Sequence, residues 1–341
     1  MIASRVCEQN QLVLHAVALH LSACRRKKAG TRLLKAHPRR RRRKTIAQIH
    51  DELGPIYFCR AYRMTYDSFL KLSSLLKDGI EEARKRNKNA GGTTPCITDG
   101  RKNNKAPVPN GRIDTTIRLA CAIRYFAGGS PYDIQCTAGV SNSEVLDSVW
   151  YVVEAINQLD DFNIHYPADE LSQRRIADEF CSKSDVKMPS CAGAIDGILV
   201  WVHKPSLKDA KKSGLGQKKF FCGRKHKFGL NCQAVSDARG RILDISIKYG
   251  GASSDLLAFE ASSLYNKLED GLLAEDLTLF GDNAYVNKPY MCTPYPNVSS
   301  GPKDDYNFFQ SQLRIRVECA FGMLVHRWAI LKSAMPHGIT I

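Results

Sequence analysis

Three acidic residues occupy positions where a carboxylate is unusual. Asp196 interrupts an apolar run, residues 194–200, which has the composition of a buried strand. Asp282 follows a second apolar run, residues 277–280, after a single glycine, and Glu318 lies in a strongly helical stretch, residues 313–331. A carboxylate in such a place is unfavourable unless it is paired or binds a metal. The three positions together predict a site that holds divalent cations against nucleic-acid phosphates.

Carboxylates in such a set suit two-metal cleavage of a phosphodiester, in which they hold two Mg²⁺ or Mn²⁺ ions about 4 Å apart. One ion activates the attacking water or 3′-hydroxyl, and the other stabilises the leaving oxygen. We expect Asp196 to bridge the ions from a central strand. Asp282, at the end of the neighbouring strand, would complete one metal site, and Glu318 would bind the second ion from a covering helix.

Each acid also has a structural interpretation. Asp196 and the glycine after it could form a bulge or turn. Asp282 could be an ordinary loop residue at the end of a strand. Glu318 could pair with Arg314 one helical turn away, which stabilises a helix by roughly 0.2–0.5 kcal/mol. Glu318 borders the apolar stripe of its helix and can reach inward past its edge. We favour one shared site because three such positions coincide.

The net charge of +16 is concentrated near the start of the chain. Residues 1–50 hold 13 Lys and Arg against the single acid Glu8, so the other 291 residues carry only about +4. We predict that residues 1–56 form a basic, largely disordered arm. Its cation run is a candidate nuclear localisation signal that also contacts phosphates, or else a solvated tail. The run consists of Arg39, Arg40, Arg41, Arg42, Arg43 and Lys44.

A second basic segment, residues 204–227, follows the strand of Asp196. It holds nine Lys and Arg with Asp209 as its one acid. Such a loop could neutralise phosphates that flank a scissile bond, although a merely solvated loop is the alternative. The candidate DNA-binding residues are Lys211, Lys212, Lys218, Lys219, Arg224, Lys225 and Lys227.

The 12 cysteines include no C-x-x-C pair. We therefore expect reduced thiols in an intracellular protein rather than disulfides or zinc ligands. The longest apolar runs fall short of 18 residues, so we expect no membrane span.

The first half of the sequence is predicted to be helical. Apolar residues recur at helical spacing within 58–76 and from about 113 to 125, separated by a polar, basic loop over 84–112. A helix opening at Ser130, a turn near Gly139 and a helix capped by Ser141 then resemble a helix-turn-helix. The last helix has no Lys or Arg between Ser141 and Ile156, so a packing module is an alternative to DNA recognition.

The pattern changes to strands in the second half. Residues 243–249 alternate between apolar and polar and form a predicted hairpin with residues 230–235. A helix over 254–268, the strand over 277–280 and the helix over 313–331 follow. This order predicts a mixed α/β domain.

The motifs around the three acids resemble those of Harbinger-type (PIF/Harbinger) DDE transposases and their domesticated nuclease relatives. The order and spacing hold over about 140 residues. The matching segments are Gly193-Ala194-Ile195-Asp196-Gly197, residues 223–226, residues 229–235, residues 250–255, Gly281-Asp282-Asn283-Ala284-Tyr285, residues 293–295, Arg316-Val317-Glu318-Cys319-Ala320-Phe321-Gly322 and residues 327–331.

The resemblance implies an α/β fold: a ribonuclease H-like mixed-sheet catalytic domain over 190–341, preceded by a small helical domain over 57–165 and a linker over 166–189. It implies that Asp196, Asp282 and Glu318 are the catalytic, metal-binding acids for two Mg²⁺ or Mn²⁺ ions. The implied activity is that of a nuclear endonuclease that cuts transposon ends and transfers the strands to target DNA. The alternatives are a domesticated, non-catalytic DNA-binding or scaffolding protein, and a ribonuclease that uses the same chemistry.

The resemblance carries three further expectations. The implied partners are terminal inverted repeats, a Myb-like DNA-binding protein and further copies of the chain. Asp255 matches another acid of the family, or else caps the start of a helix. Family members usually continue with a further helical segment beyond the point where this sequence ends, so we expect a C-terminal truncation or a degenerate copy.

Overall fold

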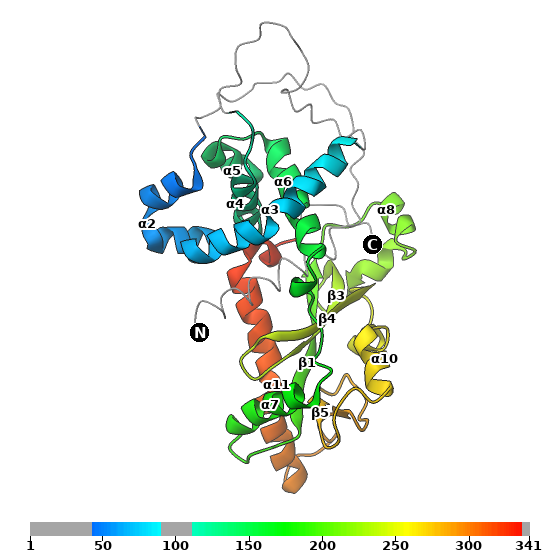
Figure 1. Ribbon diagram of the computed structural model, residues 1–341. Coiled ribbons are helices and arrows are strands. Elements are labelled where there is room, and N and C mark those ends of the chain that lie inside the picture. Colours follow the sequence, from blue (N-terminus) through cyan, green and yellow to red (C-terminus); the bar gives the residue numbers. More distant parts are fainter. Residues whose placement is uncertain (1–42, 90–110, 336–341) are drawn as a thin grey trace, which may run out of the picture. The chain divides into compact units, whose positions relative to one another are not determined.

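The computed structural model describes residues 43–89 and 111–335. These residues form two compact units (Figure 1). The helical unit extends to Asn163 and also includes Trp328–Ile330, whereas the sheet unit contains Ile164–Arg327 and the residues that follow Ile330. The acids Asp196, Asp282 and Glu318 all belong to the sheet unit.

The helical unit is built from amphipathic helices that bury aromatic and branched side chains. Phe58, Phe69 and Phe126 are completely buried, and the ring edge of Trp328 packs against Phe126 with centroids 6.4 Å apart. Its helices are α2 (Ile46–Tyr62), α3 (Tyr66–Asn89), α4 (Thr115–Phe126), α5 (Pro131–Ala138) and α6 (Asn142–Asn157), followed by the short 3₁₀ turn η1 (Asp160–Phe162).

The helix-turn-helix-like segment has the local structure that its sequence predicts. Ser130 caps α5, Gly139 ends it in the left-handed conformation with φ 63°, and the Ser141 hydroxyl accepts a hydrogen bond from the Glu144 amide at the start of α6. The apolar stripe of α6 is buried within the unit, including Val145, Val149, Val152, Val153 and Ile156. That stripe therefore serves packing.

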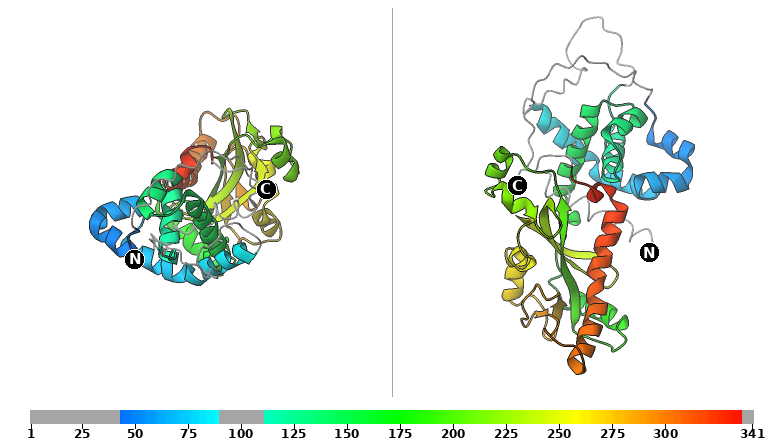
Figure 2. Two further views of the ribbon diagram at one scale, coloured as in Figure 1. Left: turned by 90° about the horizontal axis from the view of Figure 1, so that it is seen from above. Right: turned by 180° about the vertical axis from the view of Figure 1, so that it is seen from behind.

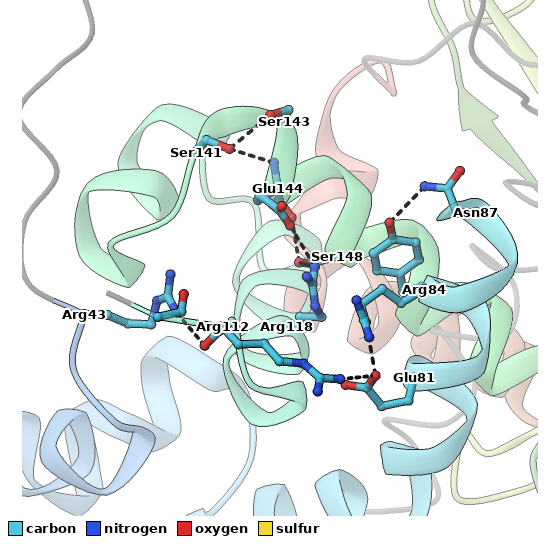
Figure 3. A network of polar contacts seen from close by, with 12 residues as sticks. Arg43, Glu81, Arg84, Asn87, Arg112, Arg118, Ser141, Ser143, Glu144 and Ser148 are labelled. Carbon is cyan, nitrogen blue, oxygen red and sulfur yellow. Dashed lines mark hydrogen bonds and ion pairs between the residues drawn. The ribbon is translucent and has the colours of Figure 1, made fainter. Parts of the chain in front are cut away.

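A polar network crosses the helical unit (Figure 3). The buried Arg118 of α4 lies 3.0 Å from a Glu144 oxygen and donates to the Ser148 hydroxyl at 3.1 Å. Its guanidinium also lies over the ring of Tyr151, whose hydroxyl accepts a hydrogen bond from Asn87 of α3. The network joins α3, α4 and α6.

The helical boundaries differ from the predicted ones in three places. Residues 58–76 form parts of two helices, because Arg63 adopts a left-handed conformation that ends α2. Helix α3 continues to Asn89, beyond the point where the polar loop was expected to begin. Helix α2 begins at Ile46, inside the range assigned to the basic arm, after a capping box formed by Thr45 and Gln48.

The sheet unit consists of one mixed sheet with helices on both faces, in the order β2-β3-β1-β5-β6, with β4 paired to β3. Helices α7 and α11 lie against one face, and α9 and α10 lie against the other (Figures 1 and 2). The strands are β1 (Cys191–Trp201), β2 (Phe221–Cys222), β3 (Lys227–Ser236), β4 (Ile242–Gly250), β5 (Thr278–Phe280) and β6 (Met291–Cys292); the helices are α7 (Glu170–Ser182), α8 (Leu207–Lys212), α9 (Asp255–Glu260), α10 (Ser263–Glu269) and α11 (Pro302–Arg327), with the 3₁₀ turns η2 (Gln217–Phe220) and η3 (Ala329–Lys332).

Alternation along β1 assigns its side chains to the two faces. Ile195 joins the core formed with α9 and α10, including Phe259 and Leu264. Ala192, on the opposite face, packs against Ala177 of α7. Asp196 therefore projects toward the face covered by α11, and Gly197 faces α9.

The sheet unit also departs from some expected boundaries. Residues 166–189, expected to be a linker, contain α7, which is capped by Asp169 and buries Ile176 and Phe180. The single helix expected over 254–268 is divided, because Ser262 starts a new helix with its own cap. Helix α11 begins at Pro302, earlier than expected, and ends at Arg327.

The predicted fold class is confirmed: a helical N-terminal region precedes a mixed sheet with helices on both faces. Among the described helices, none combines the length and apolar character that a membrane span requires.

Candidate active site

The register between β1 and β5 brings the first two acids together. The strands are parallel, with Ala194 paired to Phe280. Asp196 lies two residues further along β1, and Asp282 lies two residues beyond Phe280, the last residue of β5, so the two acids stand at about the same level where β5 ends. Gln310 of α11 fixes this end by donating to the Gly281 carbonyl at 2.8 Å. The two carboxylates are therefore neighbours because of sheet pairing, although 86 residues separate them (282 − 196).

Arg314 links the third acid to the first. Its guanidinium lies 3.6 Å from a carboxylate oxygen of Asp196 and 2.8 Å from one of Glu318, which is one turn further along α11. The Asp196 side chain is 19% exposed and the Glu318 side chain 47%. Glu318 therefore remains accessible from solvent while its helix holds it beside β1.

Like charges and burial act on Asp196. The pKa of Asp196 is raised to about 6, chiefly by burial and also by the carboxylates of Asp282 and Asp255. The amide of Gly197, which donates to the Asp196 carboxylate at 2.7 Å, and the Arg314 guanidinium oppose this shift. The raised pKa means that the negative charge on Asp196 is only partly compensated by its neighbours.

Asp255, the first residue of α9, is a fourth acid in the same region. A Cβ atom at position 197 would lie 2.2 Å from the Asp255 carboxylate and 2.6 Å from the side-chain nitrogen of Gln233. Glycine is thus required at position 197 to admit these two groups. The residue after Asp196 therefore creates the space in which Asp255 approaches the strand.

A chain of buried hydrogen bonds holds Asp255. The side-chain amides of Asn231 and Gln233 each donate to the same Asp255 oxygen at 3.0 Å. The hydroxyl of Tyr285 donates to the other end of the Gln233 amide at 2.5 Å. This connection joins the loop after Asp282 to the start of α9 through β3.

These acids have the donor chemistry of a divalent-cation site. Four carboxylates supply hard oxygen ligands of the kind that Mg²⁺ and Mn²⁺ prefer, and their mutual repulsion favours binding of a cation. In the described parts of the chain, however, no three His, Cys, Asp or Glu side chains converge as a metal-binding group. The acids surround one region but do not form a complete set of metal ligands there.

The predicted DNA-binding cations lie on α8, η2 and the β2–β3 hairpin of the sheet unit. Lys211, Lys218, Lys219, Arg224 and Lys225 are exposed. Lys227 is exposed and lies over the ring of Trp201. Lys212 ends α8, and its side chain lies outside the described part of the structure.

The predicted nuclear localisation run is described only at its end. Arg39, Arg40, Arg41 and Arg42 lie outside the described residues. The Arg43 guanidinium donates to the Arg112 carbonyl at 2.9 Å, and Lys44 forms an ion pair with Glu52. These two cations therefore also have contacts within the helical unit.

Sequence reasoning missed the residues that organise the acids. Arg314 was expected only as a helical partner of Glu318, and its reach to Asp196 depends on how α11 lies on the sheet. Asn231 and Gln233 did give a signal, because two amides at alternate positions of an apolar strand are as unusual as Asp196. Buried amides require partners, and here they share Asp255.

Comparison with known proteins agrees with this geometry. The family of DDE superfamily endonucleases matches residues 195–341, a range that includes all four acids. The chain is 26% identical over 223 residues to the protein named Putative nuclease HARBI1 from Bos taurus, with 65% of this chain and 60% of the relative covered. Protein ALP1-like from Arabidopsis thaliana is 26% identical over 234 residues, with 64% and 54% covered.

The match spans about 60% of the length of the HARBI1 relatives. No solved structure shows a significant match. Residues 195–341 are a DDE superfamily endonuclease domain, and the chain is a distant homologue of HARBI1 and ALP1-like proteins.

Proposed function

We propose that the protein is a metal-dependent DNA endonuclease that cuts transposon ends and transfers the freed strands to target DNA. Asp196 on β1 and Asp282 just beyond the end of the parallel strand β5 stand at about one level, and Arg314 links Glu318 to Asp196; this placement is the observation that carries the proposal. The match of this region to DDE endonucleases supports the reaction class.

Two divalent cations, when bound, would activate the nucleophile and stabilise the leaving oxygen. Asp196, Asp282 and Glu318 would hold them, and Asp255 lies close enough to influence Asp196 and to contribute. Arg314 draws Asp196 and Glu318 toward each other and offsets part of their charge. Because the pKa of Asp196 is about 6, a proton competes with a cation for this carboxylate below that pH, so metal binding should weaken as the pH falls.

Cleavage of DNA that carries terminal inverted repeats, with Mg²⁺ or Mn²⁺, tests the proposal. The variants Asp196→Asn, Asp282→Asn and Glu318→Gln preserve side-chain shape and should abolish cleavage. The matched control is Asp244→Asn, since Asp244 is a buried carboxyl of β4 for which burial likewise raises the pKa to about 6. Full activity of Asp196→Asn, or loss of activity in the control alone, would contradict the proposal.

A second candidate is a non-catalytic DNA-binding or scaffolding protein derived from such an enzyme. The finding that favours it is that the described acids are not gathered into a metal-binding group. Calorimetric titration with Mn²⁺ separates the two functions. An enzyme should show a site that Asp282→Asn removes, whereas a scaffold should bind DNA without any such site.

The proposed function extends to location and partners. A strand-transferring enzyme would act on terminal repeats and target DNA in the nucleus, and residues 39–44 would be its import signal. It would assemble with further copies of the chain and with a Myb-like protein that recognises DNA. Replacing residues 39–44 by alanine in a fluorescent fusion should then abolish nuclear accumulation. Undiminished accumulation would remove this part of the proposal.

A further inference from the structure

The sheet unit presents an aromatic ring under a cation at the end of the strand that carries Asp196. Trp201 is the last residue of β1, and its ring is partly exposed. The ammonium of Lys227, on the paired strand β3, lies 2.9 Å from the centre of that ring. Neither residue contributes to the acid site.

The strand pairing assigns this pair to a definite face. Trp201 is paired with Gly229, and Lys227 with Cys222. Because side chains alternate, Trp201 and Lys227 lie on the face of β1 that also carries Gly197, beside which Asp255 lies. The four residue steps from Gly197 to Trp201 span about 13 Å of strand.

The surroundings of Trp201 carry the charge that a nucleic-acid backbone requires. Residues 204–227 hold nine Lys and Arg with one acid. The hairpin tip between β2 and β3 exposes Arg224, Lys225 and His226 beside Lys227. A positive groove with an aromatic ring is the arrangement by which proteins hold unpaired strands, with phosphates on the cations and bases stacked on the ring.

We propose that Trp201 and Lys227 form a stacking site for an unpaired DNA base, on the face of β1 that Asp255 approaches. Lys227 is an exposed side chain on the ring, and such a cation is held more weakly than a stacked base. An incoming nucleotide displaces the ammonium from the ring, and the ammonium then binds the adjacent phosphate. The site thus selects ends whose strands are separated. This proposal rests on DNA being the substrate of the acid site.

Binding without cleavage tests the site independently of catalysis. Fluorescence anisotropy without divalent metal compares the full-length protein on a blunt duplex, the same duplex with an unpaired thymine extension, and an RNA strand. Trp201→Ala should weaken binding to the extended duplex about tenfold and leave the blunt duplex within about twofold. Trp201→Phe should restore most of the affinity. Lys227→Ala should weaken binding to the extended duplex and reduce its salt dependence.

Phe221 provides a matched control, since it is an exposed aromatic residue of the same hairpin. It is paired with Phe228, on the opposite face from Lys227. Phe221→Ala should therefore leave both duplex affinities near those of the wild type. If Trp201→Ala alters neither affinity, or if Phe221→Ala matches its effect, the stacking site is wrong.

Tryptophan fluorescence supplies a readout that a purely structural role would not move. Addition of the duplex with the unpaired thymine extension should quench the tryptophan emission of the wild type, and Trp201→Phe should remove that quenching. Equal quenching in both proteins would overturn the proposal, as would tighter binding of the RNA strand than of the extended duplex. Failure of cleavage with an intact preference for extended DNA would instead count against the proposed function alone.

Discussion

The Arg118 network of the helical unit and the acid site of the sheet unit differ in how far their charges are neutralised by neighbouring side chains. Arg118 meets one carboxylate, Glu144, together with a hydroxyl and an aromatic face (Figure 3). In the acid site, Arg314 faces Asp196 and Glu318, while Asp282 and Asp255 add further negative charge. The first arrangement is balanced, and the second carries surplus negative charge.

The difference separates structural from functional polar groups. A balanced pair needs nothing from outside the chain, so its removal should damage the fold. Surplus negative charge destabilises the folded state until a cation binds, so its removal should damage binding more than folding. The acid site therefore has the electrostatics of a site that is completed by a cationic ligand.

The largest effect should come from Arg118→Ala. This change leaves Glu144 partly buried without its cation and should lower the free energy of unfolding by about 3 kcal/mol. Arg86→Ala is the matched control. Arg86 of α3 forms an ion pair with Glu154 of α6 at 3.1 Å, and both side chains are exposed. It should change the free energy by less than about 1 kcal/mol. Urea unfolding measures both, and equal losses would mean that burial does not distinguish the two pairs.

Metal binding should stabilise only a protein with intact acids. At a free Mn²⁺ concentration about 100 times the dissociation constant, the free energy of unfolding should rise by about 2.7 kcal/mol. Asp282→Asn should lose this gain, and Asp244→Asn should retain it. The same gain in both variants would show that Mn²⁺ binds elsewhere.

The sequence was sufficient to identify the elements that have strong local signals. The alternation over 243–249 and the caps at Ser130 and Ser141 depend on neighbouring residues alone, and the structure confirms them. Helix α7 was also readable, since Asp169 and the spacing of Ile176 and Phe180 mark a cap and an apolar stripe. The left-handed Arg63 that divides the first helices has no such signal.

The site was predictable only as a set of acids. That Asp196 and Asp282 stand at one level follows from the parallel pairing of β1 with β5, which no local pattern encodes. The approach of Asp255 depends on the missing side chain at Gly197 and on amides from β3. Such contacts arise from tertiary packing, so the sequence could indicate their chemistry but not their geometry.

The pH dependence of stability distinguishes two acids of the sheet, the partly buried Asp196 of β1 and the buried Asp244 of β4. The pKa values of Asp196 and Asp244 are both about 6 against an ordinary value of 3.8, chiefly because of burial. The folded state therefore binds more protons than the unfolded state between about pH 4 and 6. The free energy of unfolding should fall as pH rises through this window, by up to about 3 kcal/mol for each acid, and level off above it.

Variants show how much each acid contributes to this dependence of the free energy of unfolding on pH. Asp196→Asn and Asp244→Asn should each remove part of it in metal-free urea unfolding. Saturating Mn²⁺ should reverse the Asp196 contribution, because a bound cation favours the charged carboxylate, and should leave the Asp244 contribution unchanged. A slope that neither variant alters would show that other groups control stability in this range.

The smallest effect should come from the part of the acid site that is already satisfied. Tyr285→Phe removes the hydroxyl that donates to Gln233 but keeps the ring, which packs against Phe259 with centroids 5.7 Å apart. Loss of this one buried hydrogen bond should lower the free energy of unfolding by about 1 kcal/mol. Tyr132→Phe, at an exposed tyrosine of α5, should have no measurable effect. If Tyr285→Phe is equally silent, the chain of hydrogen bonds to Asp255 does not stabilise the fold, and the acid site contains no balanced part comparable with the Arg118 network.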